Sequence, residues 1–286
     1  MNTHARLATV VAVAAALLGT AGCNKLKARD ELNKGVQAYK NANYEQAIEH
    51  FKDASRLDEN LKVAKLYLAT AYRSQYVPGV DAPDNLSMAQ QALDGYREIL
   101  EKDPQEMRAL QGTAWLYMQM KKWDQAREYY QRAIKVEPND PDLYYSIGFI
   151  DWSQAYEDAA TVKAKAGMKV EDEMKGKPDQ KICAELRAKD GAAVEEGLSN
   201  LQTAIDKRQD YDDAMAYMNL LLRRKANDMT CDDPQARAEY VKTANDWSDR
   251  AMAARKKKAE EAAKKNQQNG IVLDTPTPTP APAASK

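Results

Sequence analysis

Apolar and small residues recur along most of the chain at the spacing of amphipathic helices. In residues 43–54 an aromatic residue, an Ala, a second aromatic residue and a second Ala come at fixed offsets, and residues 122–133 repeat that order at the same offsets. Positions three or four residues apart share one face of an α-helix, so both segments are expected to be helices with one buried face. Runs of β-branched residues are scarce. The pattern therefore predicts an all-α protein.

The helical segments belong to a repeat of 34 residues. Pro104 and Pro138 are 34 positions apart, and each follows an acidic residue at the end of a helical run. This arrangement resembles the tetratricopeptide repeat, a pair of antiparallel helices, A and B, with small residues where the helices cross and Pro at the end. The best-fitting unit carries Ala114, Tyr117, Trp123, Ala126, Tyr130, Ala133 and Pro138.

The resemblance implies a tandem solenoid of about four to five units, wound as a right-handed superhelix with the A helices on its concave face. The predicted units cover residues 28–61, 62–106, 107–140, 141–211 and 212–251.

Two of these units carry insertions between their A and B helices. The small residues of the A helices, Gly35, Ala69, Ala114 and Gly148, are separated by 34, 45 and 34 positions, and the next unit follows after 71. The two spacings longer than 34 exceed it by 11 and 37 residues, and these insertions lie within residues 74–88 and 153–191. We expect the fourth A helix to run to about Lys165 and its B helix to start near Lys181. In the fifth unit, helix A should run from Asp212 to about Ala226, and helix B should start near Gln235.

The N-terminal segment has the features of an export signal. A short basic stretch precedes an uncharged apolar run, Leu7–Leu18, whose twelve residues are too few to span a bilayer. The small residues that follow and end in Cys23 resemble a bacterial lipobox, in which the cysteine is acylated and becomes the first residue of the mature chain. The resemblance implies a lipoprotein signal peptide at 1–22 and a lipidated linker at 23–27.

The residue after the cysteine bears on the location of the protein. In lipoproteins, Asp directly after the acylated cysteine resembles an inner-membrane retention signal, and this chain has Asn24 at that position. The expected location is therefore the periplasmic face of the outer membrane. An ordinary secretory signal is the alternative, and it would leave the protein periplasmic or secreted.

The C-terminal region changes composition twice. Residues 252–265 are rich in Lys, Arg and Glu and are expected to form a basic capping helix. Residues 266–286 contain alternating Thr and Pro, which cannot pack a core, and are expected to form a disordered tail.

The resemblance also implies a binding surface. Tetratricopeptide arrays bind extended peptides or partner helices in the concave groove. The groove-facing positions of the family, carried across to this chain, include Tyr39, Arg73, Arg108, Trp115, Tyr145, Phe149, Trp152 and Arg223. Aromatic residues and Arg are favoured as interface anchors. The alternative is that these side chains pack against neighbouring helices or against the long insertion. The family's carboxylate clamp is not supported, because Leu32 and Val36 occupy two of its positions.

Cys183 and Cys231 are the two cysteines besides Cys23. In an exported protein an even pair suggests a disulfide, and both cysteines fall in loops that would be neighbours on one edge of a stacked array. Two free thiols are the alternative.

Composition excludes several kinds of function. With 42 Lys+Arg against 43 Asp+Glu, the net charge of −1 gives no basic field for nucleic acid. The chain has two histidines, His4 in the signal segment and His50 on a helix B position expected to be exposed. No paired-Cys metal spacing and no phosphate-binding loop occurs, so neither a metal nor a cofactor is expected.

These observations favour a non-enzymatic scaffold that binds proteins through its groove. The alternative is an accessory subunit of an envelope enzyme, secretion or transport complex that contacts its partner through the 153–191 insertion. Deleting residues 163–181 would be one way to separate the two hypotheses.

Overall fold

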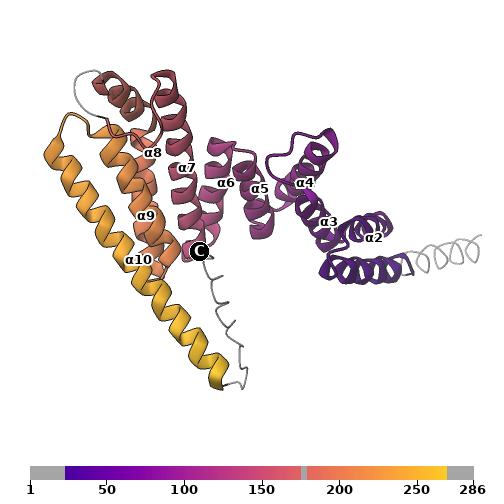
Figure 1. Ribbon diagram of the computed structural model, residues 1–286. Helices are drawn as coiled ribbons and strands as arrows, with labels where there is room; N and C mark the ends of the chain where they lie inside the picture. The colour runs from indigo at the N-terminus through magenta and orange to yellow at the C-terminus, as the bar shows by residue number, and fades with distance from the viewer. Residues whose placement is uncertain (1–22, 175–178, 269–286) are drawn as a thin grey trace, which may run out of the picture. The chain divides into compact units, whose positions relative to one another are not determined.

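The computed structural model describes residues 23–174 and 179–268, and all regular structure in these ranges is helical (Figure 1). The chain forms two compact units, one ending at Glu157 and the other beginning at Asp158. None of the described helices is long and apolar enough to cross a membrane.

The first unit is a series of helix pairs that follow one another along the chain (Figure 1). Its first helix covers residues 23–40. The helices that follow are α2 (Tyr44–Leu57), α3 (Lys62–Gln75), α4 (Pro83–Lys102), α5 (Met107–Gln119), α6 (Trp123–Val136) and most of α7 (Pro141–Lys165). Each of α2 to α5 packs against the next helix in sequence, and α3 also contacts α5. Local sequence order therefore determines most of the contacts, as expected for a repeat array.

The first and third units, which carry no insertion between helices A and B, share one type of turn there. Ala42 and Lys121 have positive φ of 58° and 56°, and each lies two residues after the end of an A helix. The next residue in each case, Asn43 or Lys122, donates its backbone N–H to a carbonyl five residues earlier, at 3.0 and 2.8 Å. This is the hydrogen bond of a Schellman motif, which satisfies a helix-end carbonyl and reverses the chain in three residues.

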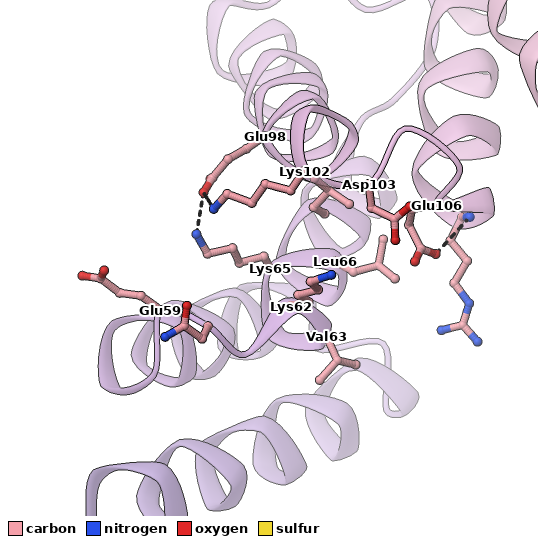
Figure 2. Close-up of a pocket in the computed structure, with 12 residues that line it drawn as sticks. Glu59, Lys62, Val63, Lys65, Leu66, Glu98, Lys102, Asp103 and Glu106 are labelled. Atoms are coloured by element: carbon pink, nitrogen blue, oxygen red, sulfur yellow. Dashed lines mark hydrogen bonds and ion pairs between the residues drawn. The ribbon is translucent and has the colours of Figure 1, made fainter. Parts of the chain in front are cut away.

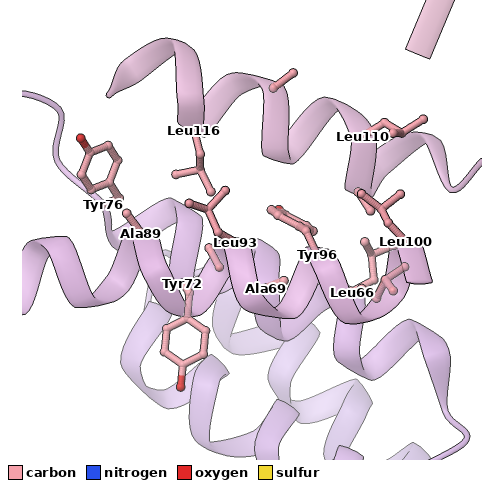
Figure 3. Packing of buried hydrophobic residues seen from close by; sticks show 14 of the residues in the cluster. Leu66, Ala69, Tyr72, Tyr76, Ala89, Leu93, Tyr96, Leu100, Leu110 and Leu116 are labelled. Carbon is pink, nitrogen blue, oxygen red and sulfur yellow. The ribbon is translucent and has the colours of Figure 1, made fainter. Parts of the chain in front are cut away.

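Large residues of the B helices fill the core at equivalent repeat positions. Phe51, Tyr96 and Tyr130 are all buried. A Cβ at Gly112 would lie 2.5 Å from the ring of Tyr96, so α5 can approach α4 this closely only without a side chain there. Figure 3 shows the residues around this contact, with Leu93 of α4 directed toward Leu116 of α5.

The second unit contains the end of α7, α8 (Gln180–Lys207), α9 (Asp212–Arg224), the π-helical turn η2 (Lys225–Met229) and α10 (Pro234–Gln268). Helix α9 packs against both α8 and α10. A small apolar cluster lies within the long insertion and contains Ala159, Val162, Met174, Cys183 and Leu186.

Most of the predicted helix boundaries match within a few residues. Helix α7 ends at Lys165, and α8 begins one residue before the predicted start. Helix α9 ends at Arg224 and continues as the π-helical turn η2, where the sequence predicted α-helix to about Ala226. A single helix, α10, contains both the fifth B helix and the basic segment 252–265.

The two ends of the chain differ from the predicted division. Residues 23–27, predicted as a linker, belong to the first helix. The tail was predicted from residue 266, but α10 continues to Gln268. The predicted signal peptide and the remainder of the predicted tail lie outside the described residues.

Candidate functional site

Two predicted groove residues meet on neighbouring A helices of the first unit. The guanidinium carbon of Arg73 on α3 lies 5.4 Å from the ring centroid of Trp115 on α5. Both side chains are half-buried, and Trp115 also packs against the core cluster. A cation over an indole ring at this distance is attracted by the ring quadrupole. The pair therefore joins α3 to α5 and leaves part of an aromatic surface accessible.

Near their first residues, helices α3 and α5 border a cavity of about 360 Å³ (Figure 2). The cavity lies where α3 and α5 begin and α4 ends. Its apolar lining comes from Val63, Leu66 and Ile99, and charged residues surround it. Arg108, a predicted groove residue, is one of them. An apolar floor with a few polar groups at its edge is the usual composition of a ligand pocket.

The charged rim is partly neutralised within the protein. Lys65 Nζ lies 2.5 Å from Glu98 Oε1, and Lys102 Nζ lies 3.4 Å from the same oxygen (Figure 2). The hydrogen bond from Lys65 lowers the pKa of Glu98 below its ordinary value, although burial opposes this. Glu106 accepts the backbone N–H of Arg108 and so caps α5. The Arg108 side chain is exposed and available to a ligand.

Three predicted aromatic residues form a continuous row along α7. Ring centroids lie 6.5 Å apart for Tyr145 and Phe149, and 6.3 Å apart for Phe149 and Trp152. Tyr156, which was not predicted, extends the row with a centroid 5.5 Å from Trp152. It lies four residues after Trp152, so helical periodicity alone would have found it. All four rings are half-buried.

Two other predicted groove residues form hydrogen bonds between helices of the protein itself. The Tyr39 hydroxyl lies 2.8 Å from Ser74 Oγ and ties the first helix to α3. Arg223 belongs to the second unit, where its guanidinium donates to Asn219 Oδ1 at 2.9 Å and to Asn245 Oδ1 at 2.7 Å. For these two residues the alternative interpretation, packing between helices, describes the observed contacts.

The predicted disulfide between Cys183 and Cys231 is confirmed, with Cα atoms 6.2 Å apart. It joins the first turn of α8 to the turn before α10. Cys23 is a free, exposed cysteine at the start of the first helix.

His50 was expected on an exposed surface, and that prediction is wrong. Its side chain is 25% exposed, and its Nδ1 lies 2.7 Å from Glu31 Oε2 on the first helix. Lys34, and after it His50, lower the pKa of Glu31 through hydrogen bonds. The histidine therefore links α2 to the first helix. No cluster of three or more potential metal-ligating side chains occurs among the described residues.

The comparisons with known proteins agree with this architecture. A family model described as TPR repeat, the tetratricopeptide repeat, matches residues 116–154, which include the end of α5, all of α6 and the first part of α7. The protein has the fold of a TPR solenoid. The predicted fold class is thereby confirmed.

Similar solved structures include a crystal structure of MamA protein, with a TM-score of 0.55 and 13% sequence identity over 82% of this chain and 94% of that one. MamA 41-end from Desulfovibrio magneticus RS-1 has a TM-score of 0.53 and 15% identity, covering 81% of this chain and 96% of that one. The comparison with curated proteins found no match. At such low identity the likeness establishes the TPR fold alone.

Proposed function

We propose that this TPR protein is a non-catalytic adaptor that binds an extended segment of a partner protein along α3 and α5. The observation that carries the proposal is the continuity of one surface. Leu66 and Arg108 line the cavity, and Arg73 and Trp115 lie seven residues further along the same two helices. Seven helical residues rise about 10 Å, which is the length of about three residues of an extended peptide.

The chemistry of this surface suits a segment with mixed side chains. The cavity offers Leu66 and Ile99 to an apolar side chain, and the exposed guanidinium of Arg108 offers hydrogen bonds to backbone carbonyls or carboxylates. The half-buried indole of Trp115 supplies a rigid contact that loses little conformational entropy on binding. The aromatic row on α7 provides further anchors of the same kind.

Site-specific photocrosslinking tests this placement. A benzophenone amino acid at position 108 should crosslink a defined partner in intact cells, because that side chain borders the cavity. The matched control is position 128, which is exposed on α6 and away from the cavity lining. Equal crosslinking to the same partner from both positions would contradict the proposal.

Substitution gives an independent test. We expect Trp115→Ala, and separately Phe149→Ala with Trp152→Ala, to reduce capture of the partner identified by crosslinking. Circular dichroism should show that the helical content is retained. Unchanged capture by both variants would refute the groove.

We further propose that the protein is acylated at Cys23 and held on the periplasmic face of the outer membrane. The apolar run, the small residues before Cys23 and the following Asn24 support this location. A disulfide is typical of an oxidising compartment and supports export. Labelled palmitate should be incorporated into the wild-type chain and not into Cys23→Ala, and only the former should fractionate with outer membranes. A wild-type chain without label would contradict acylation.

The second candidate function is an accessory subunit that uses the long insertion as its contact. The ordered segment 166–174 favours it, because Lys163 Nζ donates to the carbonyls of Val170 at 3.0 Å and Asp172 at 2.9 Å and so holds this segment in place. Lys163 is buried, so deleting residues 163–181 would damage the fold and could not discriminate.

Charge reversals on the insertion surface are a sharper test. Lys169→Glu with Glu171→Lys changes two exposed residues of the insertion, and Arg108→Glu changes one exposed residue on the cavity rim. The adaptor proposal expects loss of the partner only for Arg108→Glu, and the insertion hypothesis expects the reverse.

A further inference from the structure

The loop between α3 and α4, together with the first turn of α4, exposes an unusual share of apolar side chains. Six large hydrophobic side chains are exposed in the described part of the chain, and three of them are Val77 at 54%, Val80 at 43% and Leu86 at 42%. This is the place of the 11-residue insertion in the second unit. Single exposed apolar side chains are common on proteins, and a group of three within ten residues is a candidate interaction site.

The loop is ordered by its own sequence. Val80 N–H donates to Val77 C=O at 3.4 Å, with Pro78 and Gly79 between them and a φ of 77° at the glycine. Pro followed by Gly at positive φ is the signature of a type II turn. The turn brings Val77 and Val80 close together.

Asn85 then fastens this turn to the start of α4. Its Oδ1 accepts the backbone N–H of Val77 at 2.7 Å, and its Nδ2 donates to the carbonyls of Val77 at 2.8 Å and Val80 at 2.7 Å. At the base of the loop, Tyr76 is buried in the core. Leu86 follows Asn85 directly, so these contacts place its backbone beside the turn. The apolar side chains are thus presented on a preorganised support, which lowers the entropy cost of binding.

Charge defines which partner fits. The exposed charged residues of segment 76–86 are Asp81 and Asp84, and the segment contains no Lys or Arg. Like charges would repel an anionic lipid surface, so a membrane is a poor occupant despite the apolar side chains. A protein segment with basic residues beside apolar ones is complementary to both features.

We propose that the α3–α4 loop is a second docking site, separate from the α3–α5 surface, for a partner segment whose apolar side chains are flanked by Lys or Arg. Val77, Val80 and Leu86 cover the apolar side chains of the segment. Asp81 and Asp84 pair with its cations. The site belongs to the insertion and not to the repeat.

A defined peptide tests the proposal with the full chain. The probe is a fluorescein-labelled 14-residue peptide of Leu and Lys at helical spacing, and its control has Glu in place of Lys. Fluorescence anisotropy should show binding of the Lys peptide and not of the Glu peptide. Val77→Ser with Val80→Ser should weaken this binding about tenfold, as expected for losing two apolar contacts. Asp81→Asn with Asp84→Asn should weaken it and flatten its dependence on salt.

Met252→Ser and Asp249→Asn are the matched controls, because both residues are exposed on α10 and lie far along the sequence from the loop. They should leave the affinity unchanged. Equal affinity of the Val77→Ser/Val80→Ser chain and the Met252→Ser chain would overturn the proposal. So would equal binding of the Glu peptide, loop-dependent binding to phosphatidylglycerol vesicles in place of the peptide, or loop-dependent self-association in sedimentation. None of these outcomes bears on crosslinking from position 108.

Discussion

The two units of the protein are both built from packed helices, but they differ in how many charged side chains they bury. Among the described residues of the first unit, the one buried charged side chain is Asp151, whose partner Arg127 is partly exposed. The second unit buries Lys163, Asp190, Arg224 and Asp228. The apolar cluster within its long insertion is small. Regular repeats can be held by apolar packing, whereas the long insertion is fastened by ion pairs and a disulfide.

Three of the buried charges in the second unit, Lys163, Arg224 and Asp228, form one connected cluster. Asp228 lies 2.7 Å from Lys163 Nζ and 3.0 Å from an Arg224 nitrogen, and Arg224 also donates to the Val170 carbonyl at 3.2 Å. Burial raises the pKa of Asp228, and the nearby Arg224 and Lys163 oppose that rise. Because the π-helical turn carries Asp228, the cluster joins α7, the insertion and the end of α9.

The largest expected effect comes from breaking this cluster. Asp228→Ala would leave two buried cations without a carboxylate, and we expect it to lower the free energy of unfolding by about 3–5 kcal/mol. Asp232→Ala removes an exposed residue that pairs with Arg187, and it should leave the urea concentration at the midpoint of unfolding nearly unchanged. Urea unfolding followed by circular dichroism measures both. Similar midpoints for the two variants would show that the second unit does not depend on its buried charges.

A comparable loss in the first unit should have a different cause. Phe51→Ala would open a cavity at a fully buried position, with an expected cost of about 3–5 kcal/mol. Phe51→Leu should recover more than half of this loss, because the first unit requires volume and not a particular polar partner. The same urea experiment gives the answer. No recovery with Leu would mean that the ring shape itself is required.

Removing the disulfide should weaken the second unit alone. For Cys183→Ser with Cys231→Ser we expect a loss of about 2–4 kcal/mol, since the bond closes a long loop in the unfolded chain. Trypsin should then cut at Lys169 faster, while fragments of the first unit persist. Reduced wild-type protein is the control and should behave like the variant. Faster cleavage within residues 23–157 would contradict the division.

The smallest expected effect concerns Asp190. Burial, and then the facing Asp158 carboxylate, raise its pKa to about 7, with Lys189 opposing and Asp228 adding to the rise. Neither carboxylate oxygen of Asp190 accepts a hydrogen bond. The folded protein therefore binds a proton that the unfolded chain has lost above about pH 4. Stability should fall as the pH rises from about 4 to about 7 and stay level above that.

Asp190→Asn removes this proton and its pH dependence. We expect the variant to be more stable than wild type at pH 8, by an amount on the order of 2 kcal/mol, and to differ little at pH 4. Thermal melts at both pH values measure the difference. A shallower fall from Asp228 should remain, because its pKa is also raised. An unchanged pH dependence of stability in the variant would show that a group other than Asp190 causes it.

Much of the candidate site was predictable, and the exceptions have physical causes. Helical register placed Arg73 beside Trp115 on facing A helices, and Tyr145, Phe149 and Trp152 in one row. Register could not show that the Tyr39 hydroxyl reaches Ser74, because that bond depends on the separation of two helices. The cavity beside Leu66 also escaped prediction, since it needs three helix ends to meet.

The sequence by itself determined the helices, the repeat length and the two insertions, and it suggested the cysteine pair. These features depend on local periodicity and on counting along the chain, because each helix pair packs on its neighbour in sequence. Only the tertiary structure decided that Lys163 and Asp228 form a buried pair, that His50 pairs with Glu31, and that Asn85 holds an apolar loop outward. Such contacts join residues of ordinary surface type. Their burial depends on the packing of several helices, which no single segment encodes.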